Sequence, residues 1–412
     1  MEEWKEYKLG EICTKIGSGA TPKGGKEAYL GGDTSLIRSQ NVLDFSFSWD
    51  GLAYIDDEQA AKLNGVIIES GDVLLNITGD SVARSCVVPE SALPARVNQH
   101  VSIVRGDASM VLNDYILYFL QYKKPYLLSL SQGGATRNAL TKGMIEDLLI
   151  PLPPLSKQTD IVRILKSLDD KIEVNRRIND NLEQQAQALF KSWFVDFEPF
   201  RDQPFVESEL GMIPEGWRVG TLTSFGKIIC GKTPSKAEPS YYGGDMPFIK
   251  IPDMHNKVFV EQSEDNLSQL GDESQPAKRI PPYSILVSCI ATVGLVCINT
   301  KESHTNQQIN TIIPDFPFFR YYLYQKLLSI KDYLNNLGRG GTATLNVNTK
   351  IFGNIKIIRP LDNVLLEYEE LATPLFNMIE SNQQESRRLA QLRDTLLPRL
   401  MSGEIKVGDV TL

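Results

Sequence analysis

The feature that most constrains this chain is an internal repeat. At a shift of about 212 residues the motif Gly-x-Thr-Pro recurs, and further matches follow in the same order with small gaps. Matches in one order at a nearly constant shift indicate a duplicated domain, because a period of this length is too long for a solenoid. The matched pairs are 17–22 on 229–234, Tyr29–Asp33 on Tyr241–Asp245, Leu36–Arg38 on Phe248–Lys250, Asn98–His100 on Asn306–Gln308, Gly133–Gly134 on Gly340–Gly341, and Thr141–Lys142 on Thr349–Lys350.

The first part of each copy has the pattern of a mixed α/β domain. Short runs rich in β-forming residues, such as Gly71–Ile77 and Ser284–Ser288, are interrupted by Gly, Pro and Asp. Short helices are predicted over Asp114–Tyr122 and Phe319–Leu328. Each globular part then closes with a strand and prolines, which predicts the end of a domain.

A long amphipathic helix follows in each copy. Apolar residues step by alternating four and three, which is the pattern of a coiled-coil seam. Ser156 is a plausible N-cap for the first helix. Each helix would span roughly 38 residues, or about 57 Å. The predicted seams are Ile161, Leu165, Leu168, Ile172, Asn175, Asn179, Leu182, Ala186, Leu189 and Trp193, and then Leu371, Leu375, Met378, Asn382, Glu385, Leu389, Leu392 and Leu396.

Both seams turn polar in the middle, at Asn175 and Asn179 and at Asn382 and Glu385. These side chains could bond each other and fix the register in a parallel or an antiparallel pair. We favour the antiparallel pair, because a proline-containing linker leads from the first helix to the second domain and such packing puts the domains at opposite ends of one rod.

The predicted fold is α/β: two mixed α/β domains separated by an antiparallel pair of long coiled-coil helices, with a pseudo-two-fold internal repeat. The predicted segments are a first globular domain at 1–152, a first helix at 153–197, a linker at 198–215, a second globular domain at 216–360, a second helix at 361–402 and a C-terminal tail at 403–412.

Composition indicates the cellular compartment of the chain but does not indicate what the chain binds. No run of about 18 apolar residues occurs and the N-terminus is charged, which predicts neither a membrane span nor a signal peptide. Five scattered cysteines and three histidines make a zinc site improbable and predict reduced thiols, so we expect a cytoplasmic protein. The net charge is −8, but residues 1–150 carry 14 basic and 19 acidic groups, whereas 216–360 carry 16 and 11.

One motif imitates a nucleotide site. Residues 226–233 fit the phosphate-loop pattern G-x-x-x-x-G-K-[ST]. A phosphate loop must lead into a helix, yet Pro234 follows at once and removes a backbone N–H. Methyltransferase, nuclease and triad signatures are missing as well, so we expect no active site, no bound cofactor and no metal in this chain.

Several residues are candidates for binding DNA. Arg38, Gln40 and Asn41 follow an apolar strand, with Lys250 at the matching place, and these side-chain types contact base edges. A solvated strand end is the alternative. The repeated amide pairs at 98–99 and 306–307 are better explained as framework. Glycine-rich loops place Arg137 and Arg339 where backbone could approach a phosphate, or they pack on their own strands. The remaining basic candidates are Lys23, Arg84 and Lys232.

The chain resembles the specificity subunit of type I restriction-modification systems. Each copy begins as in this family, with a glycine-containing segment that ends in Thr-Pro, and Pro360–Asn363 departs from the family pattern at the start of the second helix. Three further segments carry the resemblance. They are Pro151–Gln158 entering the first helix, Ala188–Pro199 leaving it, and Leu396–Ile405 closing the second.

The resemblance implies a non-catalytic DNA reader. Each globular part would be a target recognition domain for one half of a split, asymmetric site in double-stranded DNA. Two methyltransferase subunits, using S-adenosylmethionine, would dock on the helices, and restriction subunits using ATP and Mg would join them. The alternatives are an ATPase acting through Lys232 and a structural tether whose globular ends bind proteins.

Overall fold

The computed structural model describes residues 4–22, 29, 31–132, 138–338 and 346–410. The chain divides into two compact units. Unit 1 comprises Met1–Glu173 with Arg387–Leu412, and unit 2 comprises Val174–Ser386. Each unit therefore holds one globular domain together with about half of each long helix.

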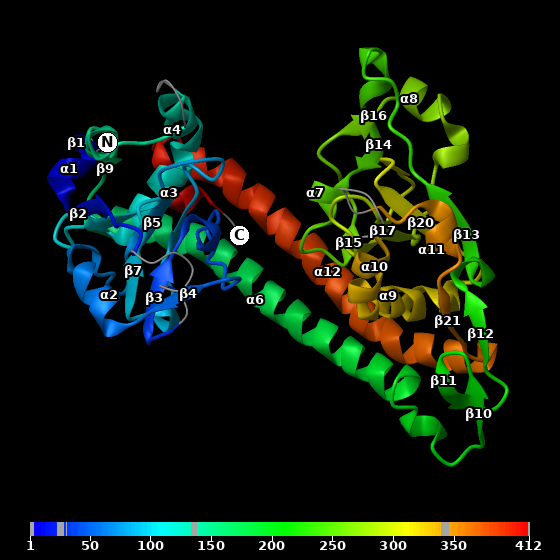
Figure 1. Ribbon diagram of the computed structural model, residues 1–412. Coiled ribbons are helices and arrows are strands. Elements are labelled where there is room, and N and C mark those ends of the chain that lie inside the picture. Colours follow the sequence, from blue (N-terminus) through cyan, green and yellow to red (C-terminus); the bar gives the residue numbers. More distant parts are fainter. Residues whose placement is uncertain (1–3, 23–28, 30, 133–137, 339–345, 411–412) are drawn as a thin grey trace. The chain divides into compact units, whose positions relative to one another are not determined.

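The first domain, in unit 1, is built around two small sheets (Figure 1). The antiparallel order β2-β8-β5-β6 forms one sheet, and β4-β3-β7 forms the other, in which β3 and β7 are parallel. The elements are β1 (Lys5–Lys8), α1 (Leu9–Ile12), β2 (Cys13–Ser18), β3 (Thr34–Ile37), β4 (Ala53–Ile55), α2 (Asp57–Lys62), β5 (Val73–Asn76), β6 (Ser85–Val87), β7 (Ala95–Val97), β8 (Val101–Gly106), α3 (Asn113–Tyr122), α4 (Lys124–Ser131), α5 (Lys142–Glu146) and β9 (Leu149–Leu152).

The second domain, in unit 2, repeats this order. Its sheets are β13-β20-β17-β18-β15 and β16-β14-β19, and β14 and β19 are again parallel. The elements are β12 (Arg218–Thr221), β13 (Gly226–Cys230), β14 (Tyr242–Ile249), α7 (Ile251–Met254), β15 (Phe259–Val260), β16 (Asn266–Leu267), α8 (Gln269–Glu273), β17 (Ile285–Ser288), β18 (Val296–Asn299), β19 (His304–Thr305), β20 (Ile309–Pro314), α9 (Arg320–Ser329), α10 (Lys331–Gly338), α11 (Thr349–Gly353) and β21 (Lys356–Arg359).

Equivalent contacts in the two domains confirm the duplication. The buried Tyr115 hydroxyl donates to the carbonyl of Pro151 at 2.8 Å, and Tyr322 donates to Ile358 at 2.5 Å. Both pairs are related by a shift of 207 residues. The same shift corrects one predicted match: Thr141 corresponds to Asn348, not Thr349, since Thr141 and Asn348 are the N-caps of α5 and α11.

The long helices are α6 (Leu155–Phe194) and α12 (Asp362–Met401), each of 40 residues. The predicted N-cap at Ser156 is wrong. The carbonyl of Pro154 accepts the first helical hydrogen bonds, from the amides of Lys157 and Gln158, so Ser156 lies inside the first turn. The fully buried Gln158 side chain accepts from Leu112 N at 3.0 Å and donates to Met110 O at 2.9 Å, which ties the helix start to the first domain.

The predicted seam of α6 is confirmed, because none of its positions is exposed. The predicted seam of α12 is wrong at three positions: Leu371, Met378 and Leu392 are exposed by 49%, 51% and 39%. Ala372, Ile379 and Arg393 are buried instead. The buried stripe is thus shifted by one residue at these three positions.

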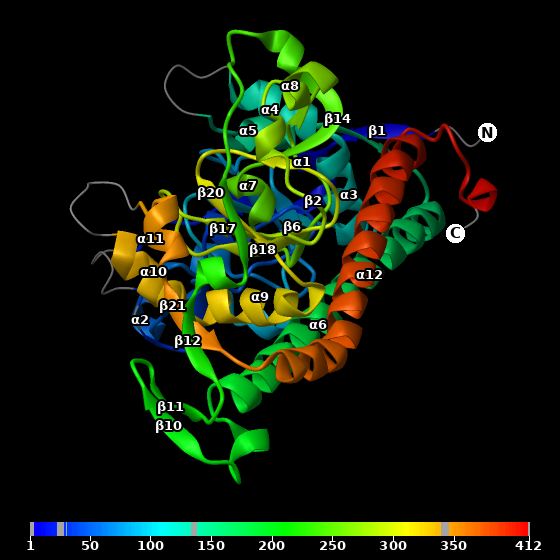
Figure 2. The same ribbon diagram turned by 90° about the vertical axis from the view of Figure 1, so that its right-hand side faces the viewer.

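The helices lie side by side and run in opposite directions within each unit (Figures 1 and 2). In unit 2, Asn175 donates to Glu385 at 2.7 Å, while Asn382 donates to Asn179 at 2.9 Å. In unit 1, Arg393 of α12 pairs with Asp169 of α6 at 2.6 Å. The predicted antiparallel pairing and the bonded polar middle are therefore both confirmed.

The predicted linker contains structure of its own. Strands β10 (Phe205–Ser208) and β11 (Gly211–Pro214) form an antiparallel hairpin in unit 2. In unit 1 the tail packs against the first domain through Ile405, Val407 and Val410. In the described part of the chain, no helix is long and apolar enough to cross a membrane.

Candidate nucleic-acid interface

In each domain the two parallel strands end at the same edge. In unit 1, the amide of Asn98, just after β7, donates to the carbonyl of Ile37 at the end of β3, at 3.1 Å. In unit 2, Asn306 N donates to Ile249 O at 3.2 Å. The residues that follow these strands therefore gather at one place. We call this place the readout edge: Arg38–Asn41 with Asn98–His100 in unit 1, and Lys250–Asp253 with Asn306–Gln308 in unit 2.

The Gly-x-Thr-Pro motif closes against this edge. Thr21 donates to the Gln99 side-chain oxygen, and Thr233 donates to Gln307 Oε1 at 2.5 Å. The glycines allow the close approach: a Cβ on Gly19 would lie 1.7 Å from the carbonyl oxygen of Val97. A Cβ on Gly231 would lie 2.2 Å from the carbonyl oxygen of Asn306. The motif thus holds the edge in shape.

The repeated asparagines stabilise the same turn in both copies. Asn98 Oδ1 accepts from the amide of His100 at 3.0 Å, and Asn306 Oδ1 accepts from that of Gln308 at 3.1 Å. Both asparagines are buried. These contacts support their interpretation as framework residues.

The three neighbouring candidates of the first domain differ in accessibility. Arg38 is half-buried and its Nη2 donates to Gly51 O at 2.5 Å, while Gln40 is exposed and donates to Asp50 O at 3.1 Å. Asn41 is 0% exposed, and its amide bonds Ser48 O and the backbone N of Arg38. In this conformation Asn41 presents nothing to a base edge, because its side chain caps the turn that Arg38 begins.

Lys250 occupies the position of Arg38, with nearly the same backbone angles: φ −121° and ψ 171°, against −119° and 167°. Its amide donates to the buried Asp253 at 2.8 Å, as Arg38 does to Asn41. The Lys250 ammonium forms an ion pair with Asp265. Its charge is therefore partly balanced within the domain.

The other two described candidates each lie beside the readout edge of their own domain. Arg84 lies in the loop between β5 and β6, where its carbonyl accepts from Asn76 N at 2.8 Å. The Asn76 side chain donates to Ser39 O at 2.9 Å, which joins this loop to the turn that carries Gln40. Lys232, just after β13, is exposed and its amide donates to Thr305 O. Lys23, Arg137 and Arg339 lie outside the described residues.

The phosphate-loop pattern does not form a phosphate loop. Gly226–Cys230 is strand β13, paired with β20. No helix begins after Thr233; the next helical turn is the 3₁₀ segment Pro239–Tyr241. The backbone therefore lacks the helix N-terminus that a nucleotide phosphate needs. Over the described ranges no three His, Cys, Asp or Glu side chains are grouped to hold a metal ion.

A hydrogen-bond chain at the readout edge was not predicted. His100 Nδ1 lies 2.6 Å from Thr78 Oγ1, and its Nε2 lies 2.9 Å from Gln99 Nε2. The backbone bond Ile77 N to His100 O corresponds to Cys289 N to Gln308 O, so Gln308 takes the place of His100. The sequence holds a signal for this position: the amide pairs match between the copies, whereas the residue after each pair is His100 in one copy and Gln308 in the other.

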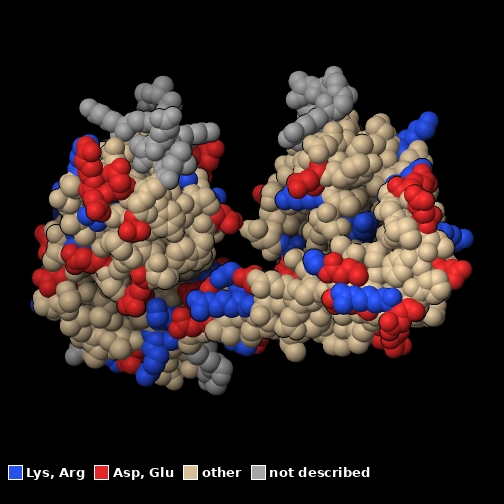
Figure 3. All heavy atoms as spheres, turned by 60° about the horizontal axis from the view of Figure 1, so that its bottom comes forward, with Lys and Arg blue, Asp and Glu red and all other residues tan. Residues whose placement is uncertain are grey.

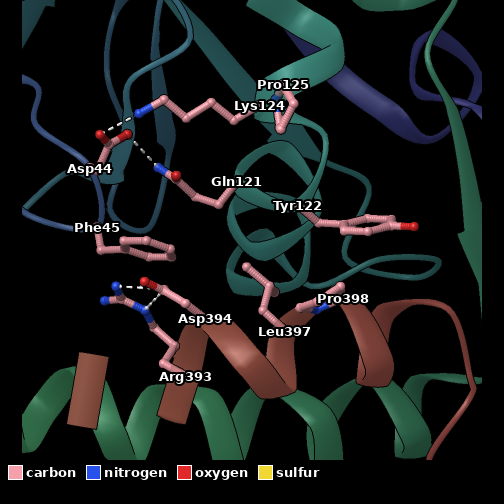
Figure 4. A pocket seen from close by; sticks show the side chains of 10 residues that line it. All are labelled: Asp44, Phe45, Gln121, Tyr122, Lys124, Pro125, Arg393, Asp394, Leu397 and Pro398. Carbon is pink, nitrogen blue, oxygen red and sulfur yellow. Dashed lines mark hydrogen bonds and ion pairs between the residues drawn. The ribbon is translucent and has the colours of Figure 1, made fainter. Parts of the chain in front are cut away.

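Unit 1 also contains a polar junction between the first domain and the long helices, and Figure 4 shows the pocket beside it, with Arg393 and Phe45 among the lining residues. Tyr118 donates to Asp169 at 2.7 Å, Arg393 pairs with Asp169, and the Arg393 guanidinium lies 3.7 Å from the ring centre of Phe45. Burial raises the pKa of Asp169. A pocket of about 650 Å³ lies beside this junction, and its charged side chains pair within the unit, Lys124 with Asp44 and Arg393 with Asp394.

Surface charge is mixed on the face shown in Figure 3, where Lys and Arg side chains are interspersed with Asp and Glu. Any phosphate contact must therefore come from local groups and not from a broad basic face on that side.

The comparisons with known proteins agree on one family. The family model for the type I restriction modification DNA specificity domain matches residues 1–184 and 214–392. The HindI specificity subunit of Haemophilus influenzae is 36% identical, over 98% of this chain and 100% of its own length. The MjaIX specificity subunit of Methanocaldococcus jannaschii is 28% identical, over 99% and 95%. The crystal structure of the type I system S subunit from M. genitalium superposes with a TM-score of 0.56 at 13% identity, covering 97% of this chain and 96% of that one.

Proposed function

The chain belongs to the family of type I restriction-modification specificity subunits, and from this premise we propose that it reads a split, asymmetric site in double-stranded DNA. Each globular domain reads one half of the site through its readout edge and the adjoining β5–β6 or β17–β18 loop. The chain itself is non-catalytic and acts in the cytoplasm.

One observation carries this proposal: equivalent positions at the two edges hold different chemistry on a shared frame. The Gly-x-Thr-Pro contact and the buried asparagine recur in both domains. His100 and Thr78 of the first domain are replaced by Gln308 and Ile290 in the second. A constant frame with variable hydrogen-bonding groups is what two readers of different sequences require, because base identity is read by donors and acceptors in the groove.

The helices are the proposed docking surface for two methyltransferase subunits, which would use S-adenosylmethionine. Large apolar side chains on α12 support this assignment: Leu366, Leu371 and Met378 are 47%, 49% and 51% exposed. Restriction subunits that use ATP and Mg would complete the assembly. No cofactor is assigned to this chain.

Methylation mapping tests the proposal. The chain is co-expressed with its cognate methyltransferase, and the host genome is sequenced for methyladenine. We expect a motif of two short halves separated by an unspecified spacer. Replacing residues 1–150 with those of another family member should change one half only. A change in both halves, or a continuous motif, would contradict the assignment of one half to each domain.

A further inference from the structure

Three lysines of the second domain lie on segments that meet at the end of β13. Lys278 Nζ donates to the carbonyl of Cys230, the last residue of the strand, at 2.9 Å. Lys232 is the second residue after the strand and is exposed. Lys350 is exposed on α11, whose first residue, Thr349, donates to Asn310 at 3.0 Å, and Asn310 is the register partner of Cys230. None of the three forms an ion pair with a carboxylate in the described part of the chain.

A buried polar network holds the backbone at this point. The Gln275 side chain donates to the carbonyl of Lys232 at 3.0 Å and lies 3.2 Å from His304 Nδ1. His304 Nε2 in turn lies 2.7 Å from Asp272, which pairs with Arg279. Gln275, His304 and Asp272 are each at most 7% exposed. Burying polar groups is costly unless they are bonded, and the Gln275 amide nitrogen uses its bonds to hold the Lys232 carbonyl, so the network supports the lysine-bearing segment.

Among its described residues, which leave out 23–28 and 133–137, the first domain has no counterpart of either feature. Structural equivalence places Ala20, Val66 and Gly143 at the positions of Lys232, Lys278 and Lys350. Lys142, next to Gly143, is paired with Glu146. The network is also missing, since Leu63 and Arg96 stand at the positions of Gln275 and His304. This difference contributes to the opposite net charges of the domains, −5 for residues 1–150 and +5 for residues 216–360.

We infer that Lys232, Lys278 and Lys350 form a phosphate-binding site for the DNA backbone, and that this site anchors the second half of the recognition sequence more strongly than the first. The inference rests on the proposed function. Lys232 precedes Thr233, which donates to Gln307 of the readout edge, and the Cys230 thiol beside Lys278 donates to the Gln307 carbonyl, so a backbone phosphate held there would lie beside the bases read by this domain. Phosphate contacts fix position and register, whereas base contacts give specificity.

Salt dependence of binding tests the site directly. The purified full chain is titrated with a fluorescent 40-base-pair duplex of arbitrary sequence at several salt concentrations. Each lost phosphate contact makes the negative slope of log K against log salt shallower by about 0.9. The slope of the variant K232A/K278A/K350A should therefore be smaller in magnitude than that of the wild type by about 2.7. At about 0.1 M salt this corresponds to a loss in affinity of roughly 500-fold, if the two proteins bind equally at 1 M salt.

A matched control separates the site from net charge. Arg218, Lys227 and Lys257 are exposed on the same domain, and no ion pair joins them to carboxylates among the described residues. R218A/K227A/K257A removes the same charge and should leave the slope nearly unchanged. Equal losses in both triple variants would overturn the site, as would an unchanged slope in K232A/K278A/K350A. A wild-type chain whose DNA binding is absent or independent of salt would instead overturn the proposed function.

The asymmetry has its own test. Ala20 is exposed and a Cβ on Gly143 meets no atom within 4 Å, so both positions accept a longer side chain. Introducing A20K/G143K should raise the slope by about 1.8 if the first domain lacks such contacts and presents the equivalent surface to DNA. An unchanged slope would show that the equivalent surface does not face the backbone, and would contradict the inference.

Discussion

Asn382 Nδ2 donates to Asn179 Oδ1 at 2.9 Å, and both side chains are buried between α6 and α12. The 207-residue shift between the two helices relates Asn175 to Asn382 and Ser386 to Asn179. Asn175 also donates to Ser386, at 3.3 Å, so the repeat exchanges the two bonded pairs with each other. The polar layer therefore fixes the register of the antiparallel helices at one place in unit 2.

The first prediction concerns this layer. Asn382→Ala leaves Asn179 buried without its partner and should lower the free energy of unfolding by about 1–3 kcal/mol. Ser381→Ala, at the adjacent exposed position, should change it by less than about 0.5 kcal/mol. Urea unfolding followed by circular dichroism measures both. The double variant N179L/N382L removes both polar partners and should recover most of the lost free energy of unfolding. Equal losses of free energy in S381A and N382A would contradict the stabilising role of the asparagine pair.

A second prediction concerns the junction in unit 1. Arg393 is 9% exposed, so Arg393→Ala leaves the half-buried Asp169 without its ion-pair partner and should cost about 3 kcal/mol. Arg399, on the same helix, pairs with Glu404 in an exposed position. Arg399→Ala should therefore cost no more than about 1 kcal/mol. Urea unfolding measures both variants. Similar losses of stability in R393A and R399A would show that the Arg393–Asp169 pair stabilises the protein no more than an exposed pair does.

A third prediction concerns the close backbone approach at Gly19. The Cβ of Gly19→Ala would lie 1.7 Å from Val97 O, so the backbone must shift, and we expect a loss of about 3 kcal/mol. Gly143→Ala is the control, because its Cβ would meet nothing within 4 Å on helix α5. Thermal unfolding should show a lower midpoint for G19A only. A G19A variant as stable as G143A would mean that this motif tolerates a side chain.

Much of this architecture could be predicted from the sequence. The repeat and the two helices follow from a constant shift and a period of three and four, and the central asparagines mark the polar layer. The frame of α12 could not be predicted, because Leu371 and Met378 are apolar yet exposed, while Arg393 is buried. Periodicity shows which residues share a face but not which of two adjacent faces is covered.

The candidate interface was predictable to a similar extent. Arg38, Gln40 and Asn41 are adjacent in sequence and lie at one strand end, but the burial of Asn41 depends on a turn that bonds its amide. The lysines around β13 were not recognised as a group, because 46 residues separate Lys232 from Lys278 and a further 72 separate Lys278 from Lys350. Their proximity depends on strand pairing and on the packing of α11 beside β13, neither of which sequence spacing shows.

The last prediction concerns pH. Glu369 of α12 is 14% exposed and lies 3.8 Å from Arg320. Burial is the largest influence on its pKa and raises it to about 7, although Arg320 opposes the shift. Because the folded state holds the proton more tightly than the unfolded chain, unit 2 should lose stability as pH rises from about 4.5 to about 7. A shift of this size corresponds to at most about 3 kcal/mol.

Glu369→Gln should flatten this dependence of stability on pH. The fluorescence of the buried Trp193 and Trp217 reports the unfolding of unit 2 during heating. The exposed Glu370→Gln should keep the wild-type profile. Parallel pH profiles for wild type and E369Q would contradict the assignment to Glu369, because the change in stability would then arise from another group such as Glu183, whose pKa burial also raises to about 7.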